Sequence, residues 1–114
     1  MIPYAAQWVR FFGLTLGTEL LVAAPLLAGP WPRRLLAVTV ANFATHPFVW
    51  FVLAQAGLSR TVLTLVAEPW ALAFETLVYA LAYPAMPRSR VLAASAIANA
   101  ASYGLGSVLA ARLA

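Results

Sequence analysis

Three chemically versatile residue types are missing from this chain of 114 residues: cysteine, lysine and aspartate. Without cysteine there are no disulfides, no thiolate zinc sites and no cysteine nucleophile. Without lysine there is no Walker A lysine and no Schiff-base amine, and without aspartate there is no Ser-His-Asp triad and no EF-hand loop. Charge is scarce as well, because only 9% of the residues are charged, against about 25% in a soluble domain.

Apolar residues dominate what is there: 64% of the chain is hydrophobic, against about 45–50% in a soluble domain. A transmembrane helix needs about 20 apolar residues. Four runs of that length occur, at 11–29 (with a start near Pro3 left open), 35–56, 61–83 and 91–111. Helices joined by such short links must be antiparallel neighbours. The sequence therefore predicts an all-α integral membrane four-helix bundle, with residues 1–114 forming a single transmembrane domain.

The cations are all arginines, and all seven lie in the links or at the ends of the apolar runs. Those of the first and third links are Arg33, Arg34, Arg88 and Arg90, and those of the opposite side are Arg10, Arg60 and Arg112. Positive charge favours the cytoplasmic side, so we expect both termini outside a prokaryotic inner or cell membrane, with dual insertion left open by the margin of one. The formal charge of +4 does not indicate nucleic acid, because the arginines stand singly or in pairs as membrane flanks do. The expected partner is the lipid bilayer, with a homodimer or a membrane partner subunit left open.

The two halves of the chain resemble each other. The stretch Glu19-Leu-Leu-Val-Ala-Ala matches Glu75-Thr-Leu-Val-Tyr-Ala, and each is followed by a link containing Pro-Arg. The later stretches Asn42-Phe-Ala-Thr-His and Asn99-Ala-Ala-Ser-Tyr match in the same way. We interpret the chain as two tandem two-helix repeats, about 1–57 and 58–114, related by a pseudo-twofold axis along the membrane normal. Chance similarity in an Ala/Leu-rich sequence is the alternative.

Every acidic residue and the only histidine lie inside the apolar runs. An acidic residue at the centre of a membrane helix costs about 2.5–3.5 kcal/mol, so we expect these side chains to face the bundle interior. Glu68 and Glu75 are seven residues apart and share one helical face, which Tyr79 extends. Helical spacing thus predicts a buried ligand- or proton-binding site. Its members are Glu19, Asn42, His46, Glu68, Glu75, Asn99 and Tyr103.

The buried negative charge has to be neutralised, and no arginine lies at that depth. A protonated His46 would balance one of the three carboxylates, which leaves two for bound protons or for one divalent cation. Hard oxygen ligands with one imidazole suit Mn, Fe, Zn or Mg. The metal ligands would then be Glu19, His46, Glu68 and Glu75. The alternative is interhelical hydrogen bonding, with protonated glutamates paired to asparagines.

These residues favour transport of an ion or a small solute by glutamates that exchange protons or bind a metal ion. A second hypothesis is a metal-dependent intramembrane enzyme acting on a lipid-like substrate, although the Glu-x-x-His pattern of di-iron bundles does not occur. A third is a structural or accessory subunit in which the polar groups hold the helices together. Whether the chain is an enzyme is left open, no residue is assigned a catalytic role, and a divalent metal ion is the only cofactor considered.

Two stretches resemble a pattern of uncharacterised small prokaryotic membrane proteins. They are Asn42-Phe-Ala-Thr45-His46-Pro47 and the pair Glu68 and Glu75, and they cover the second and third apolar runs. This resemblance implies no activity, because such proteins have no established one. In size and helix number the chain is also similar to small multidrug resistance transporters, whose first helix carries one essential Glu at the position that Glu19 would hold. The glutamates of the third run, His46 and the duplication depart from that family, so the likeness is one of architecture.

Overall fold

The computed structural model describes residues 3–113, and within that range it contains four long helices, two short 3₁₀ turns and no strand. The elements are α1 (Tyr4–Val22), η1 (Ala24–Leu26), α2 (Trp31–Phe51), η2 (Leu53–Gln55), α3 (Arg60–Ala82) and α4 (Arg88–Leu113). Four spans within them, Tyr4–Leu26, Trp31–Gln55, Arg60–Ala82 and Arg88–Leu109, are long and apolar enough to cross a membrane. The expected all-α four-helix architecture is confirmed, and it is consistent with an integral membrane protein.

Prolines and glycines set the helix boundaries. Pro30 is the N-cap of α2 and Pro32 lies in its first turn, where a missing N–H leaves no helical hydrogen bond unmade. Because Pro30 and Pro32 favour a helix start at this point, α2 begins at Trp31, before the expected apolar run at 35–56. Gly29 and Gly57, in the loops before α2 and α3, have φ angles of 86° and 75°, a left-handed conformation that residues with a Cβ rarely adopt. Ser59 caps α3 by accepting a hydrogen bond from its first turn.

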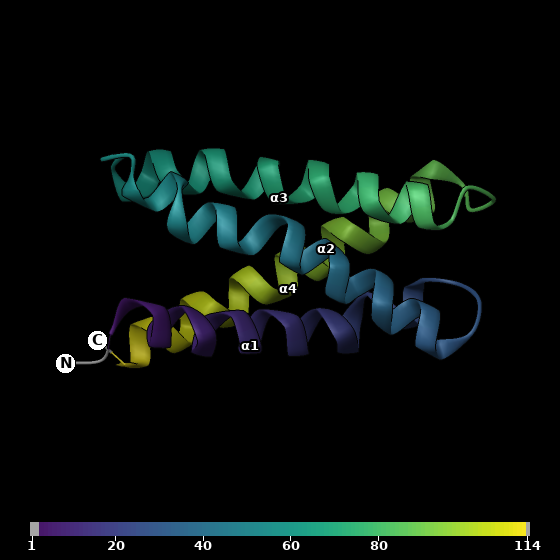
Figure 1. Cartoon of the computed structure of the whole chain (residues 1–114), viewed down its shortest axis with the longest axis horizontal. Coiled ribbons are helices and arrows are strands. Elements are labelled where there is room, and N and C mark those ends of the chain that lie inside the picture. The colour runs from purple at the N-terminus through teal and green to yellow at the C-terminus, as the bar shows by residue number, and fades with distance from the viewer. Residues whose placement is uncertain (1–2, 114) are drawn as a thin grey trace.

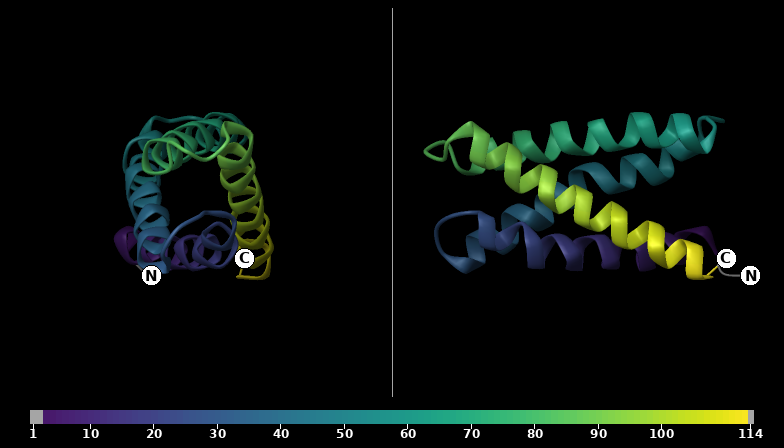
Figure 2. Two further views of the ribbon diagram at one scale, coloured as in Figure 1. Left: turned by 90° about the vertical axis from the view of Figure 1, so that its right-hand side faces the viewer. Right: turned by 180° about the vertical axis from the view of Figure 1, so that it is seen from behind.

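The four helices form a closed ring in which each helix packs against two others. Both α1 and α3 pack against α2 and α4, as the view along the bundle in Figure 2 shows. In Figure 1, α1 and α3 run in the same direction on opposite sides, and α2 and α4 return diagonally between them. The bundle measures 45 × 23 × 20 Å, so its long dimension exceeds the roughly 30 Å hydrocarbon core of a bilayer.

The two ends of the bundle differ. The chain ends and the loop before α3 lie at one end, which we call the terminal end, and the loops at 27–30 and 83–87 lie at the other, which we call the hairpin end (Figure 1). At the hairpin end, Arg33 donates to the carbonyl of Ala82, and Arg90 Nε donates to the carbonyl of Leu26 at 3.3 Å. Arg33 of α2 therefore donates to the last residue of α3, and Arg90 of α4 donates to the last residue of η1, which follows α1. Carbonyls at the C-terminal end of a helix have no donor within the helix, so each arginine supplies one.

The distribution of the arginines along the bundle is as expected. The residues at or near the hairpin end are Arg33, Arg34, Arg88 and Arg90, and those toward the terminal end are Arg10, Arg60 and Arg112. Which end faces the cytoplasm stays a prediction.

Large apolar side chains lie on the surface, while carboxyl and amide groups are buried inside. Leu21, Leu65 and Leu81 expose 80%, 68% and 73% of their side chains, whereas Glu19 and Asn42 expose none of theirs. A soluble protein buries its leucines and exposes its glutamates. The reverse arrangement suits a lipid bilayer, in which apolar side chains face the lipid and polar groups pair inside the protein.

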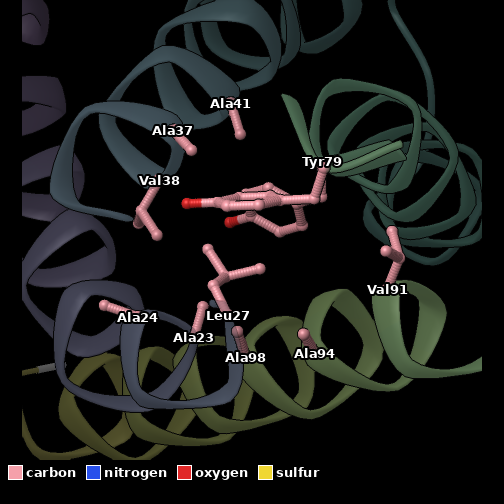
Figure 3. Packing of buried hydrophobic residues seen from close by; sticks show 11 residues of the cluster. Ala23, Ala24, Leu27, Ala37, Val38, Ala41, Tyr79, Val91, Ala94 and Ala98 are labelled. Atoms are coloured by element: carbon pink, nitrogen blue, oxygen red, sulfur yellow. The ribbon is translucent and has the colours of Figure 1, made fainter. Parts of the chain in front are cut away.

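The apolar core fills the hairpin half of the bundle. Tyr79 projects from α3 toward η1 and the facing surfaces of α2 and α4, with Leu27 and Val38 near its ring (Figure 3). Alanines make up most of the rest of the core, and their small side chains let the helices approach closely. The whole cluster is Ala23, Ala24, Leu27, Ala37, Val38, Ala41, Tyr79, Tyr83, Val91, Ala94 and Ala98.

Candidate functional site

Two carboxyl groups lie side by side inside the bundle, Glu19 from α1 and Glu75 from α3. Both are buried, with exposed fractions of 0% and 1%. Glu75 accepts hydrogen bonds on both oxygens, from Thr45 Oγ1 at 3.3 Å and from the Asn99 side-chain amide. Both oxygens of Glu19 are buried without a hydrogen-bond partner. The pair is therefore asymmetric, with one carboxyl fully supported and the other unsupported.

Asn42 and Asn99 flank this carboxyl pair from α2 and α4. Each donates its side-chain amide to the carbonyl one turn earlier in its own helix, Asn42 to Val38 at 2.9 Å and Asn99 to Ser95 at 2.8 Å. Asn99 also reaches Glu75, whereas the side-chain oxygen of Asn42, beside Glu19, is buried without a partner. The unsupported polar atoms thus gather around Glu19.

A cavity of about 340 Å³ runs from the terminal end of the bundle to this pair. Arg60, in the first turn of α3, lines its outer part, and Asn42 and Glu75 line its inner part. His46 and Glu68 lie between these levels, as their positions in α2 and α3 require. Glu19 is not among the lining residues. The cavity consequently connects one carboxyl of the pair, and not the other, with the terminal end.

The hydrogen bond of His46 determines which of its nitrogens carries a proton. Trp8 Nε1 donates to His46 Nδ1 at 3.1 Å. An indole N–H can only donate, so Nδ1 is the unprotonated nitrogen and the ring proton lies on Nε2. In this arrangement His46 is neutral and contributes no positive charge to balance the carboxylates. The three glutamates must then be neutralised by something other than the histidine.

The structure brings all seven predicted site residues together in two connected groups. Glu19, Asn42, Glu75 and Asn99 form the central group, and His46, Glu68 and Tyr103 line the cavity that leads to it. Within residues 3–113, no three His, Asp or Glu side chains gather closely enough to hold a metal ion. The metal-ligand set of Glu19, His46, Glu68 and Glu75 stays a prediction.

Three residues take part in this region that the sequence did not assign to it. Thr45 supports Glu75 and belongs to the Asn42-x-x-Thr45 pattern, so its place one turn from Asn42 was a usable signal. Tyr79 extends the face of Glu68 and Glu75 but is not among the predicted site residues. Trp8 is 38 residues from its partner His46, and nothing in the spacing indicates that pairing.

A search of protein-family models, of curated proteins and of solved structures finds no match to this chain. The site is therefore interpreted from its own chemistry.

Proposed function

We propose that this chain is a membrane protein that binds a proton between Glu19 and Glu75 and exchanges it through the cavity, as part of proton-coupled transport of an ion or a small solute. In this proposal Glu75 is the member of the pair that receives the proton from the cavity side, and Glu19 is the inner member. Glu68 and His46 line the route between the terminal end and Glu75.

The observation that carries the proposal is the unsupported Glu19 carboxyl beside the supported Glu75. An ionised carboxylate buried without donors is very costly, and two adjacent carboxylates repel each other. One proton held between them removes a charge and supplies a hydrogen bond, as it does when two carboxyl groups share a site in aspartic proteases. If Glu19 carries the proton, it can donate to Glu75, which then remains the ionised acceptor of the bonds from Thr45 and Asn99.

The cavity supports exchange of that proton. Glu75 lies at its inner part, and Glu68, half-buried on the same face of α3, is exposed to the same space. The Nε2–H of His46 is the polar group of that ring left free for the cavity, because Nδ1 is occupied by Trp8. Donors and acceptors that face a water-filled space can pass protons by exchange with water. A purely structural carboxyl pair would not need such access.

The proposed duplication gives this site its symmetry. Aligning the repeats exchanges Glu19 with Glu75, Asn42 with Asn99 and Arg33 with Arg90. It also exchanges Leu26 with Ala82, so the two hydrogen bonds from arginine to carbonyl at the hairpin end correspond to each other. The opposite placement of α1 and α3, and of α2 and α4, fits a pseudo-twofold axis along the bundle (Figure 2). Parallel-repeat transporters place their substrate sites at such repeat interfaces.

Proton flux into liposomes tests the proposal. Purified protein is reconstituted with a pH-sensitive dye inside, and flux is driven by an imposed potential. We expect that Glu75→Gln and Glu19→Gln reduce the flux to that of protein-free liposomes while far-ultraviolet circular dichroism and elution volume stay unchanged. Thr18→Val is the matched control, because Thr18 neighbours Glu19 in α1 but bonds only to the carbonyl of Leu14. Wild-type flux in both glutamine variants would contradict the proposal.

A structural role is the second candidate, and one observation favours it: Glu75 is bonded to both α2 and α4, through Thr45 and Asn99. Interhelical bonds of this kind hold membrane helices together. The same liposomes separate the two candidates. A structural role predicts no flux above the protein-free level even for the wild-type chain.

A further inference from the structure

The closed hairpin half of the bundle contains two buried hydroxyl groups without a hydrogen-bond partner, those of Tyr79 and Tyr83. Tyr79 is fully buried and Tyr83 exposes 6% of its side chain. Both rings belong to the apolar core, where phenylalanine would fill the same space. A buried hydroxyl that makes no hydrogen bond costs about 1–3 kcal/mol, and native proteins pair nearly all such groups, with protein or with ordered water. Packing alone thus accounts for the rings and leaves the hydroxyls unexplained.

These hydroxyls continue a line that begins at the cavity. Glu68, Glu75, Tyr79 and Tyr83 follow one another on α3 and its C-cap at helical spacing, so they share one face. At 1.5 Å of rise per residue they cover roughly 22 Å, most of the roughly 30 Å hydrocarbon core. Glu68 and Glu75 line the cavity on the terminal side of this line. The two tyrosines extend it through the half of the bundle that the cavity does not reach.

On α3, Tyr79 lies one helical turn after Glu75 and one turn before Tyr83, the C-cap of the helix. Glu75, Glu19 and Tyr83 are its ionisable neighbours. Both oxygens of Glu19 and the side-chain oxygen of Asn42 are also buried without a partner. Polar groups without protein partners therefore run from the carboxyl pair to the hairpin end. Arg33, whose guanidinium lies 5.1 Å from the centre of the Tyr83 ring, marks where this line reaches that end.

We propose that Tyr79 and Tyr83, with water molecules between them, conduct protons from the Glu19–Glu75 pair to the hairpin end. This inference rests on the proposed function and completes its route across the membrane. A phenolic hydroxyl is both donor and acceptor, so it can relay a proton without ionising. When a proton arrives, a new O–H bond forms on the tyrosine oxygen as its original O–H bond breaks toward the next water. One proton enters from the carboxyl pair, one leaves beyond Tyr83, and each tyrosine is neutral before and after.

The test is Tyr79→Phe, which removes one hydroxyl and keeps the ring. We expect proton flux in liposomes to fall about tenfold, the effect of one missing hydrogen bond in the rate-limiting barrier. Because the hydroxyl has no protein partner, we expect the thermal unfolding midpoint to stay the same or rise. Tyr83→Phe should act in the same direction. Wild-type flux in Tyr79→Phe would overturn the proposal.

Thr39→Val is the matched control, because it also removes one hydroxyl from the hairpin half of the bundle and keeps the shape of the side chain. Thr39 lies on α2 and its hydroxyl donates to the carbonyl of Leu35 in its own helix, so it is not part of the line of Tyr79 and Tyr83. We expect wild-type flux in Thr39→Val. An equal loss in this control would overturn the proposal, because it would show that any lost hydroxyl of this half has the same effect.

A second readout separates failure of this inference from failure of the proposed function. The infrared carbonyl band of a protonated carboxyl, identified by its loss in Glu19→Gln, reports proton binding at the central pair without any flux. We expect Tyr79→Phe to keep this band while the flux falls. The band together with wild-type flux in Tyr79→Phe would overturn the tyrosine route alone and leave the proposed function intact. A band without flux in the wild-type chain would match the structural role and overturn the proposed proton exchange. Absence of both band and flux would overturn the proposed function together with the route.

Discussion

Glu19 and Glu75 lie side by side inside the bundle, yet only Glu75 has hydrogen-bond donors. The two carboxyls occupy matching positions in the proposed repeats, so their sequence surroundings do not distinguish them. Their environments do, because Thr45 and Asn99 both point at Glu75 while Asn42 donates to its own helix. The same substitution at the two positions should therefore have different consequences.

The first prediction concerns stability of the two glutamine variants. In Glu75→Gln the ionised acceptor of two charge-assisted hydrogen bonds becomes a neutral amide with a single acceptor oxygen, so we expect a loss of about 1 kcal/mol and a lower unfolding midpoint. In Glu19→Gln the new amide can donate to neighbouring acceptors that now have no partner, so the midpoint should stay or rise. Thermal unfolding in one detergent measures both. Equal shifts would contradict the asymmetry.

The second prediction isolates the contact between α2 and α3. Thr45→Val removes one of the two donors to Glu75, and we expect a lower unfolding midpoint, equivalent to about 1–3 kcal/mol, because a buried acceptor loses its partner. Thr39→Val is the matched control. Both threonines bond to a carbonyl one turn earlier, Thr39 to Leu35 and Thr45 to Ala41, but only Thr45 also reaches another helix. Equal destabilisation of the two variants would show that the contact with Glu75 contributes nothing.

The third prediction uses the single histidine of the chain. Its nitrogen NMR spectrum contains one imidazole, so the assignment is unambiguous. We expect an unprotonated Nδ1 and a protonated Nε2 at neutral pH, because Trp8 donates to Nδ1. Trp8→Phe should remove this preference for one tautomer. A doubly protonated ring in the wild-type protein would contradict the arrangement.

The same spectrum bears on the metal hypothesis. A His46 that keeps its proton on Nε2 and its Nδ1 on Trp8 has no free lone pair for a metal ion. We therefore expect added Zn²⁺ to leave both nitrogen signals unchanged. A shift of either signal at one equivalent of Zn²⁺ would favour the set of Glu19, His46, Glu68 and Glu75 as ligands.

Much of the fold could be predicted from the sequence because a bilayer constrains it strongly. Segments that face lipid must be long and apolar, and the short links force antiparallel neighbours. The glutamates were found for the same reason, since a carboxyl in an apolar run has to face inward. Both signals are local, and each was visible within a single segment of the chain.

The pairing within the site could not be predicted, because it depends on how the helices cross. Helical periodicity places Asn42 and His46 on one stripe, and both line the cavity. It does not predict that Asn42 lies beside Glu19 and that His46 accepts a hydrogen bond from Trp8. Nor does periodicity tell which of two equivalent glutamates takes the donors. The tilt of α2 and α4 across the bundle decides these contacts (Figure 1), and it arises from packing of small side chains on several helices together.

The last prediction concerns access to the interior and is tested by labelling an introduced cysteine. The chain contains no cysteine, so an introduced thiol is the only one and any labelling must occur there. Ser102 lines the cavity, whereas Ala98, one turn away on the same helix, is fully buried in the apolar core. A membrane-impermeant maleimide should therefore label Ser102→Cys and leave Ala98→Cys unlabelled. If the hairpin end faces the cytoplasm, as the arginine distribution predicts, labelling should occur in intact cells. Labelling only in inside-out vesicles would reverse the orientation and keep the one-sided cavity. Equal labelling of both variants would show that the hairpin half is open, and the core around Tyr79 would then not close that side of the bundle.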